Sequence, residues 1–161
     1  MTVFFRFAQF ACLAVLLAVP IASPEAMGSD TSSTPSSSLR GSSDYQKAER
    51  AVKDKDWKGA IALLEKVIAG EPRNANALNY LGYSHRNVGE REKALGYYKR
   101  ALDVEPNHLG ANEYLGELYL QMGDLPAAEE RLKVLERACR NCEEKRELAE
   151  KIEKHKKAKG S

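Results

Sequence analysis

Along the chain from residue 44 onward, apolar residues recur at intervals of three and four positions, as in Leu115, Leu118, Tyr119 and Met122. That spacing places the apolar side chains on one face of an α-helix, which has about 3.6 residues per turn. No stretch alternates apolar and polar residues for long enough to indicate a strand. The pattern therefore predicts an all-α protein.

The same region repeats itself at a fixed period of 34 residues. Small residues, glycines, prolines and large apolar residues all return at this interval: Pro72 with Pro106, Gly82 with Gly116, Gly89 with Gly123, and the series Ala60, Ala94, Ala128 and Leu64, Tyr98, Leu132. A constant period across several residue types indicates a repeat architecture, in which each unit packs on the next.

The middle unit resembles the tetratricopeptide repeat, whose signature positions are occupied here by Leu78, Leu81, Gly82, Gly89, Ala94, Tyr98, Ala101 and Pro106. The resemblance covers about residues 44–137. It implies two antiparallel helices per repeat and three repeats, 44–74, 75–108 and 109–138, forming a right-handed solenoid. The six implied helices lie near residues 44–55, 57–70, 75–88, 91–104, 109–122 and 125–138.

Residues 139–161 are predicted to form a capping helix and a basic tail. Asn141 is a favourable N-cap residue, two glutamates follow it, and several lysines end the segment, as expected for the two poles of a helix dipole. Leu148 and Ile152 make a narrow apolar stripe that would cover the open end of the third repeat.

The N-terminal segment predicts export. Residues 1–26 combine Arg6, an apolar run and small residues near Ala26, which is the layout of a signal peptide. Residues 27–43 are rich in Ser, Thr and Gly, which predicts a disordered linker. We expect a periplasmic or secreted protein of an exported bacterial type; the alternative is an uncleaved segment that anchors the protein in the inner membrane, facing the periplasm.

Charge argues against nucleic acid as the partner. Lysine and arginine nearly balance aspartate and glutamate, for a formal net charge of +2. This value does not indicate the broad basic surface that is typical of a nucleic-acid-binding protein. The lysine-rich end from Lys151 to Lys159 is interrupted by Glu153 and is typical of a helix C-terminus.

Cys139 and Cys142 remain after removal of the signal segment. In an oxidising compartment this pair predicts a structural disulfide that fixes the angle of the capping helix. Thiol-redox activity remains an alternative, because Cys142 near a helix N-terminus would have a lowered pKa. A zinc site would need two more ligands, and covalent haem is excluded because Glu143 stands where a histidine is required.

Catalytic motifs are not found in this sequence. His85 lies on the apolar side of a repeat helix and is interpreted as a packed histidine, and the carboxylates occur in charged helical faces. We therefore expect a non-catalytic protein with no cofactor and no metal.

The family resemblance also implies where a partner would bind, since the first helix of each repeat lines a concave groove in such proteins. The matching residues are Asn76, Asn79, Tyr83, Arg86 and Asn87 in the second repeat and Glu113, Glu117 and Gln121 in the third. Members that clamp the C-terminal carboxylate of chaperones use lysine, asparagine and arginine at certain positions; the matching positions here carry Tyr45, Glu49, Tyr80, Gly110 and Tyr114, so that clamp is absent.

These observations favour a scaffold or assembly adaptor that holds a peptide or helix of another protein in the groove. A thiol-redox or cofactor-delivery helper acting through Cys139 and Cys142 is the alternative. Neither the partner nor the oligomeric state follows from the sequence, because repeat folds host many unrelated ligands.

Overall fold

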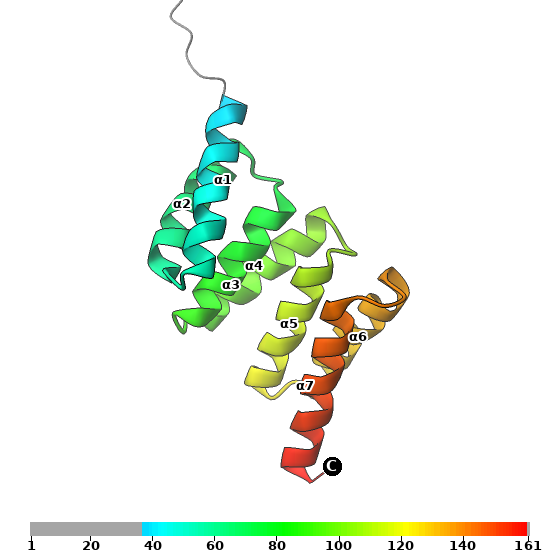
Figure 1. Ribbon diagram of the computed structural model, residues 1–161. Coiled ribbons are helices and arrows are strands. Elements are labelled where there is room, and N and C mark those ends of the chain that lie inside the picture. The colour runs from blue at the N-terminus through cyan, green and yellow to red at the C-terminus, as the bar shows by residue number, and fades with distance from the viewer. Residues whose placement is uncertain (1–36, 161) are drawn as a thin grey trace, which may run out of the picture. The chain divides into compact units, whose positions relative to one another are not determined.

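The computed structural model describes residues 37–160, and within them the chain forms helices and no strand. The helices are α1 (Ser37–Lys53), α2 (Trp57–Gly70), α3 (Ala75–Asn87), α4 (Arg91–Val104), α5 (Leu109–Met122), α6 (Leu125–Ala138) and α7 (Glu143–Lys159) (Figure 1). The first six form three consecutive pairs, and each pair packs on the next. The all-α repeat fold with a C-terminal capping helix is confirmed.

Helix α1 begins at Ser37, inside the segment that the sequence predicted as linker. The predicted start was Asp44. Once the packed part of α1 around Ala48 is formed, each further residue extends an existing helix without the cost of a new nucleus. The predicted signal segment, residues 1–26, and the linker up to residue 36 lie outside the described residues.

The helix boundaries follow from local chemistry that repeats with the 34-residue period. Asp56, Asn74 and Asp124 each accept a hydrogen bond from the backbone N–H three residues later, which caps α2, α3 and α6. Within the second and third repeats, Gly89 and Gly123 take the left-handed conformation, with φ of 86° and 80°, because they lack a Cβ atom.

Lys55 takes the place of these glycines in the first repeat and has the same left-handed conformation, with φ of 59°. The turn around it repeats the hydrogen bonds of the glycine turns: the N–H of Lys55 donates to the carbonyl of Val52, as the N–H of Gly123 donates to that of Leu120. The first repeat therefore forms the same turn with a residue less suited to it.

The core runs through the repeats and ends under α7. Small residues allow close packing: a Cβ atom added to Gly82 would lie 2.6 Å from the ring of Tyr98 on α4. At Gly116, the equivalent position of the third repeat, the close neighbour is Leu148 of α7. Leu148 and Ile152 are 0% and 2% exposed, so α7 buries its apolar stripe against α5 and α6.

The junction between α6 and α7 holds the two cysteines. Cys139 ends α6 and Cys142 is the N-cap of α7, and their sulfur atoms lie at disulfide-bonding distance with the Cα atoms 5.9 Å apart. The prediction that Asn141 caps the helix was wrong. Asn141 lies inside the short loop that this pair closes, so the residue directly before α7 is Cys142.

Candidate functional site

Four of the predicted groove residues line one cavity of about 310 Å³. They are Tyr83 and Arg86 of α3 and Glu113 and Glu117 of α5. The remaining lining residues are Tyr114 of α5 and, from α7, Glu143, Glu144, Glu147 and Lys151. The cavity therefore lies where two groove helices meet the capping helix.

Arg86 is held inside this site by the chain itself. Its guanidinium forms an ion pair with Glu117, and both side chains are largely buried, at 9% and 12% exposed. It also lies 5.3 Å from the centre of the Tyr83 ring and 5.5 Å from that of Tyr114. Arg86 was predicted to face a partner in the groove; in the structure its guanidinium pairs with a carboxylate of α5.

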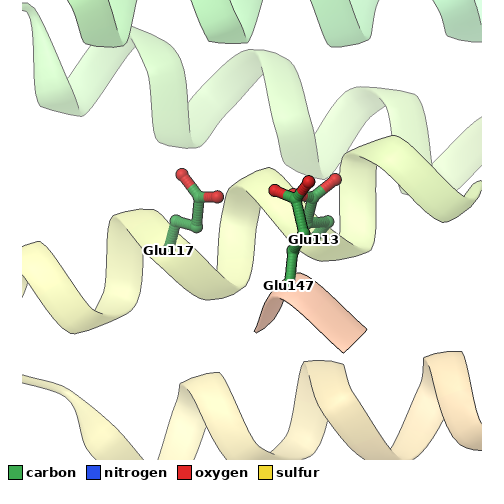
Figure 2. Close-up of side chains that lie close together, drawn as sticks. All are labelled: Glu113, Glu117 and Glu147. Atoms are coloured by element: carbon green, nitrogen blue, oxygen red, sulfur yellow. The ribbon is translucent and has the colours of Figure 1, made fainter. Parts of the chain in front are cut away.

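Three carboxylates converge beside Arg86. Glu113 and Glu117 stand one turn apart on α5, and Glu147 reaches them from α7 (Figure 2). One oxygen from each lies within 4.8 Å of the others. Lys151 joins the group: its ammonium pairs with Glu117, lies 3.0 Å from Glu147 and 3.6 Å from Glu113. Such a cluster could hold a metal ion, but the ammonium of Lys151 already supplies positive charge at this point.

The pKa values of these carboxyl groups are shifted in opposite directions. Desolvation, followed by the nearby charge of Glu117, raises the pKa of Glu113 to about 8, although Lys151 opposes this. Glu113 therefore carries a proton near neutral pH. The pKa of Glu147 is lowered, chiefly by its hydrogen bond with Lys151. The site thus combines a buried carboxyl that keeps its proton, Glu113, with one that loses its proton readily, Glu147.

A row of tyrosines continues from the cavity across the groove helices. We call Tyr45, Tyr80, Tyr83 and Tyr114 the tyrosine row. The rings of Tyr83 and Tyr114 lie 4.7 Å apart and those of Tyr45 and Tyr80 6.1 Å apart, measured between centroids. The pKa values of Tyr45, Tyr80 and Tyr114 are raised, first by desolvation and then by neighbouring glutamates. The row joins α1, α3 and α5 into one surface that is aromatic and acidic.

Tyr98 lies directly behind this surface. The side chain comes from α4, is 0% exposed, and packs over Gly82. Desolvation raises the pKa of its hydroxyl, and the nearby charges that act on it are those of Arg86 and Glu117, both cavity residues. Within the described part of the chain, this hydroxyl has no hydrogen-bond partner.

The other predicted groove residues do not join the cavity. Oδ1 of Asn76 accepts a hydrogen bond from Nε2 of His108, 2.9 Å away, because Nδ1 of that ring accepts from the N–H of Ala111; this bond ties α3 to the start of α5. Asn79 is 5% exposed and packs against Gly110. Asn87 donates to the backbone carbonyl of Tyr83 at 2.8 Å. These three amides therefore have structural contacts in the free protein.

Gln121 lines a second and more apolar cavity of about 410 Å³ between α5 and α7. The two cavities share Glu117 and Lys151, so they form adjoining parts of the same seam. The contributions of Glu147 and Lys151 were missed in the sequence. Their spacing of four residues was visible, but it is equally typical of a solvated helical face.

His85 lies away from the cavity. It is 4% exposed, its Nδ1 atom is 2.6 Å from a carboxylate oxygen of Glu90, and its ring stacks on Tyr97. This environment fits the interpretation of His85 as a packed histidine. No helix between residues 37 and 160 is both long enough and apolar enough to cross a membrane.

Comparisons with known proteins identify the repeat. A family model described as "Anaphase-promoting complex, cyclosome, subunit 3" matches residues 53–138. "Tetratricopeptide repeat protein 37" of Xenopus laevis is 29% identical over 97 residues; the match covers 56% of this chain and 6% of that protein. The chain therefore corresponds to a small part of its relative.

Solved structures show the same fold. "First TPR of Spaghetti (RPAP3) bound to HSP90 peptide SRMEEVD" superposes with a TM-score of 0.68 at 15% identity, covering 77% of this chain and 96% of that one. "TPR2B-domain:pHsp70-complex of yeast Sti1" superposes with a TM-score of 0.69 at 15% identity, covering 74% and 98%. At this identity the likeness concerns the fold alone.

Proposed function

We propose that this chain, which belongs to the tetratricopeptide-repeat family described by that model, is a non-catalytic scaffold that holds a peptide or helix of another protein in its groove. The observation that carries the proposal is the tyrosine row, which ends at a cavity lined by α3, α5 and α7. Structural relatives that hold HSP90 and HSP70 peptides support a protein partner.

The chemistry of the groove suits a peptide. Half-buried tyrosines offer large, rigid apolar surfaces that lose little conformational freedom when a partner covers them, and each keeps a hydroxyl for hydrogen bonding. Because Arg86 is already fixed between Tyr83 and Tyr114, part of this surface is organised before any partner arrives.

The partner differs from the acidic peptides held by the structural relatives. The peptide SRMEEVD ends in Glu-Glu-Val-Asp, and three of these four residues are acidic. Here the groove presents Glu49, Glu113 and Glu117, and the carboxylate-clamp positions carry tyrosine and glutamate. A peptide of that kind would meet like charge in this groove.

We also propose that the scaffold works outside the cytoplasm. The signal-like residues 1–26 support export, and the pairing of Cys139 with Cys142 is compatible with an oxidising compartment. Retention of residues 1–26 in protein isolated from its source would instead support the membrane-anchored alternative.

Affinity capture tests the groove. Full-length protein and a Tyr83→Ala variant are incubated with extract of the source cells, and captured proteins are identified by mass spectrometry. Tyr97→Ala is the matched control, because it truncates a partly buried tyrosine on α4. Circular dichroism must first show that both variants are folded. A protein lost only with Tyr83→Ala supports the groove, whereas equal recovery by all three proteins contradicts it.

The cysteine pair supports a second candidate, a thiol-redox or cofactor-delivery helper. Cys142 precedes the first turn of α7, where a thiolate is stabilised by the helix N-terminus. Replacing both cysteines with alanine separates the two functions. Lower stability with unchanged partner binding supports a structural role, whereas unchanged stability with lost activity supports the redox role.

A further inference from the structure

We propose that the cavity between α3, α5 and α7 takes a cationic side chain, lysine or arginine, of the bound partner. This inference rests on the proposed groove function and specifies the chemistry of the partner. It is carried by the charge of the cavity lining, by the size and walls of the cavity, and by the unpaired hydroxyl behind it.

Charge complementarity is the first argument. The lining holds five glutamates against one arginine and one lysine. Both cations bind the carboxylate of Glu117, and Lys151 also contacts Glu147. Since burial keeps a proton on Glu113, four glutamates face two cations, and the excess negative charge is available to a ligand.

Two of the lining glutamates, Glu143 and Glu144, lie in the first turn of α7. Glu144 makes no ion pair with any residue between 43 and 160. Glu143 has one contact with a cation, 3.7 Å from Arg146, and both of those side chains are more than 70% exposed. Such an exposed pair contributes little, so Glu143 remains free to bind another cation.

The walls and volume fit one side chain. A cavity of about 310 Å³ is at the lower limit of small-ligand sites, so it suits a side chain rather than a whole helix. Its wall contains Tyr83 and Tyr114, and these rings already stack with the guanidinium of Arg86. The chain itself thus shows that this wall accommodates a cationic group.

The hydroxyl of Tyr98 is an independent observation. It is fully buried, it has no hydrogen-bond partner among the described residues, and it lies close enough to Arg86 and Glu117 for their charges to act on it. A buried polar atom without a partner is unusual in a stable fold. Tyr98 is not a lining residue, but its ring centroid lies 6.4 Å from that of Tyr114, which is, so the unpaired hydroxyl belongs to the layer behind the cavity wall.

A peptide display experiment tests the inference with full-length protein. A library of random peptides of about 12 residues is selected on the wild type and on Tyr83→Ala. Each enriched peptide is then measured by fluorescence polarisation, together with versions in which one lysine or arginine is replaced by glutamine. This change in the peptide leaves the protein untouched, so it tests the inference even if a protein variant fails to fold.

The protein variant is Glu143→Gln with Glu144→Gln, which removes the two lining carboxylates in the first turn of α7 and leaves the Arg86, Glu117 and Lys151 ion pairs in place. Glu136→Gln with Glu150→Gln is the matched control, because it removes the same charge from exposed positions that do not line the cavity.

We expect enriched peptides to share a lysine or arginine. Replacing it with glutamine should weaken binding about tenfold, and Glu143→Gln with Glu144→Gln should weaken it about fivefold or more, with no change in the control. Binding should also weaken with added salt. Groove-dependent peptides with no essential basic residue would overturn the inference while leaving the proposed function intact. Peptides that bind Tyr83→Ala as well as the wild type would overturn the proposed function itself.

Discussion

The packing of α7 on α5 predicts that the effect of Gly116→Ala changes sign with the residue at position 148. A Cβ atom added to Gly116 would lie 2.6 and 2.7 Å from the two Cδ atoms of Leu148. Leu148 is 0% exposed, so its branches have no free space into which to move. Truncating Leu148 to alanine removes the atoms that the new methyl group would meet.

The magnitudes follow from this geometry. Leu148→Ala removes three buried carbon atoms and leaves a cavity, which lowers the free energy of unfolding by about 2.7–5 kcal/mol. The higher helix propensity of alanine in Gly116→Ala raises the free energy of unfolding by up to about 1 kcal/mol. Overpacking by the added methyl group lowers it by about 1–3 kcal/mol. In the wild type Gly116→Ala should therefore destabilise by as much as ~2 kcal/mol. In the Leu148→Ala background the overpacking is absent, so the same change should stabilise by about 1 kcal/mol.

Urea unfolding followed by circular dichroism measures all four proteins of this cycle. Gly82→Ala is the matched control. Its added Cβ would meet the Tyr98 ring at 2.6 Å and not Leu148, so its effect should be the same in both backgrounds within about 0.5 kcal/mol. If Gly116→Ala, like this control, destabilises both backgrounds by the same amount, α7 does not pack on α5 as described.

Three further predictions concern the turn, the buried carboxyl and the cysteine pair. Lys55→Gly should raise the free energy of unfolding by about 0.5–1 kcal/mol, because glycine adopts the left-handed conformation without strain; an unchanged urea midpoint would contradict this. Glu113 prefers its proton in the folded state, where its pKa is about 8 instead of the usual 4.5 of an exposed glutamate, so its favourable contribution is complete below about pH 4.5 and is lost as the pH rises through 8. Glu113→Gln should therefore be more stable than the wild type by at least ~1 kcal/mol at pH 9 and nearly equal to it at pH 4.5; urea unfolding at the two pH values would refute this if the difference did not grow with pH. Reduction of the Cys139 and Cys142 pair should lower stability by no more than about 2 kcal/mol, because the loop it closes is short, and unfolding with and without reductant measures the loss.

The helices of the three repeats were predictable because the signals that begin and end them are local. Gly89 and Gly123 each end a helix within one turn of the chain, and the 34-residue period confirms the assignment by repetition. The start of α1 was missed because helix extension from a packed segment needs no specific signal.

The interior of the site was not predictable to the same degree. The pairing of Arg86 with Glu117 joins residues 31 positions apart, and that of Lys151 with Glu117 joins residues 34 apart. Which of the two glutamates on α5 faces each cation depends on the angle at which α7 packs. The chain enters α7 at the junction of Cys139 and Cys142, outside the repeats, where no second copy of the pattern exists to compare.

Site-specific photo-crosslinking tests the central claim, that the groove holds a segment of another protein. p-Benzoylphenylalanine is introduced in place of Tyr83 in one protein and in place of Lys99, which is exposed on α4, in another. Both are irradiated in the source cells, and the adducts are resolved by mass. We predict a discrete adduct from position 83 that is missing from position 99. An adduct from position 99 with none from position 83 would contradict the account.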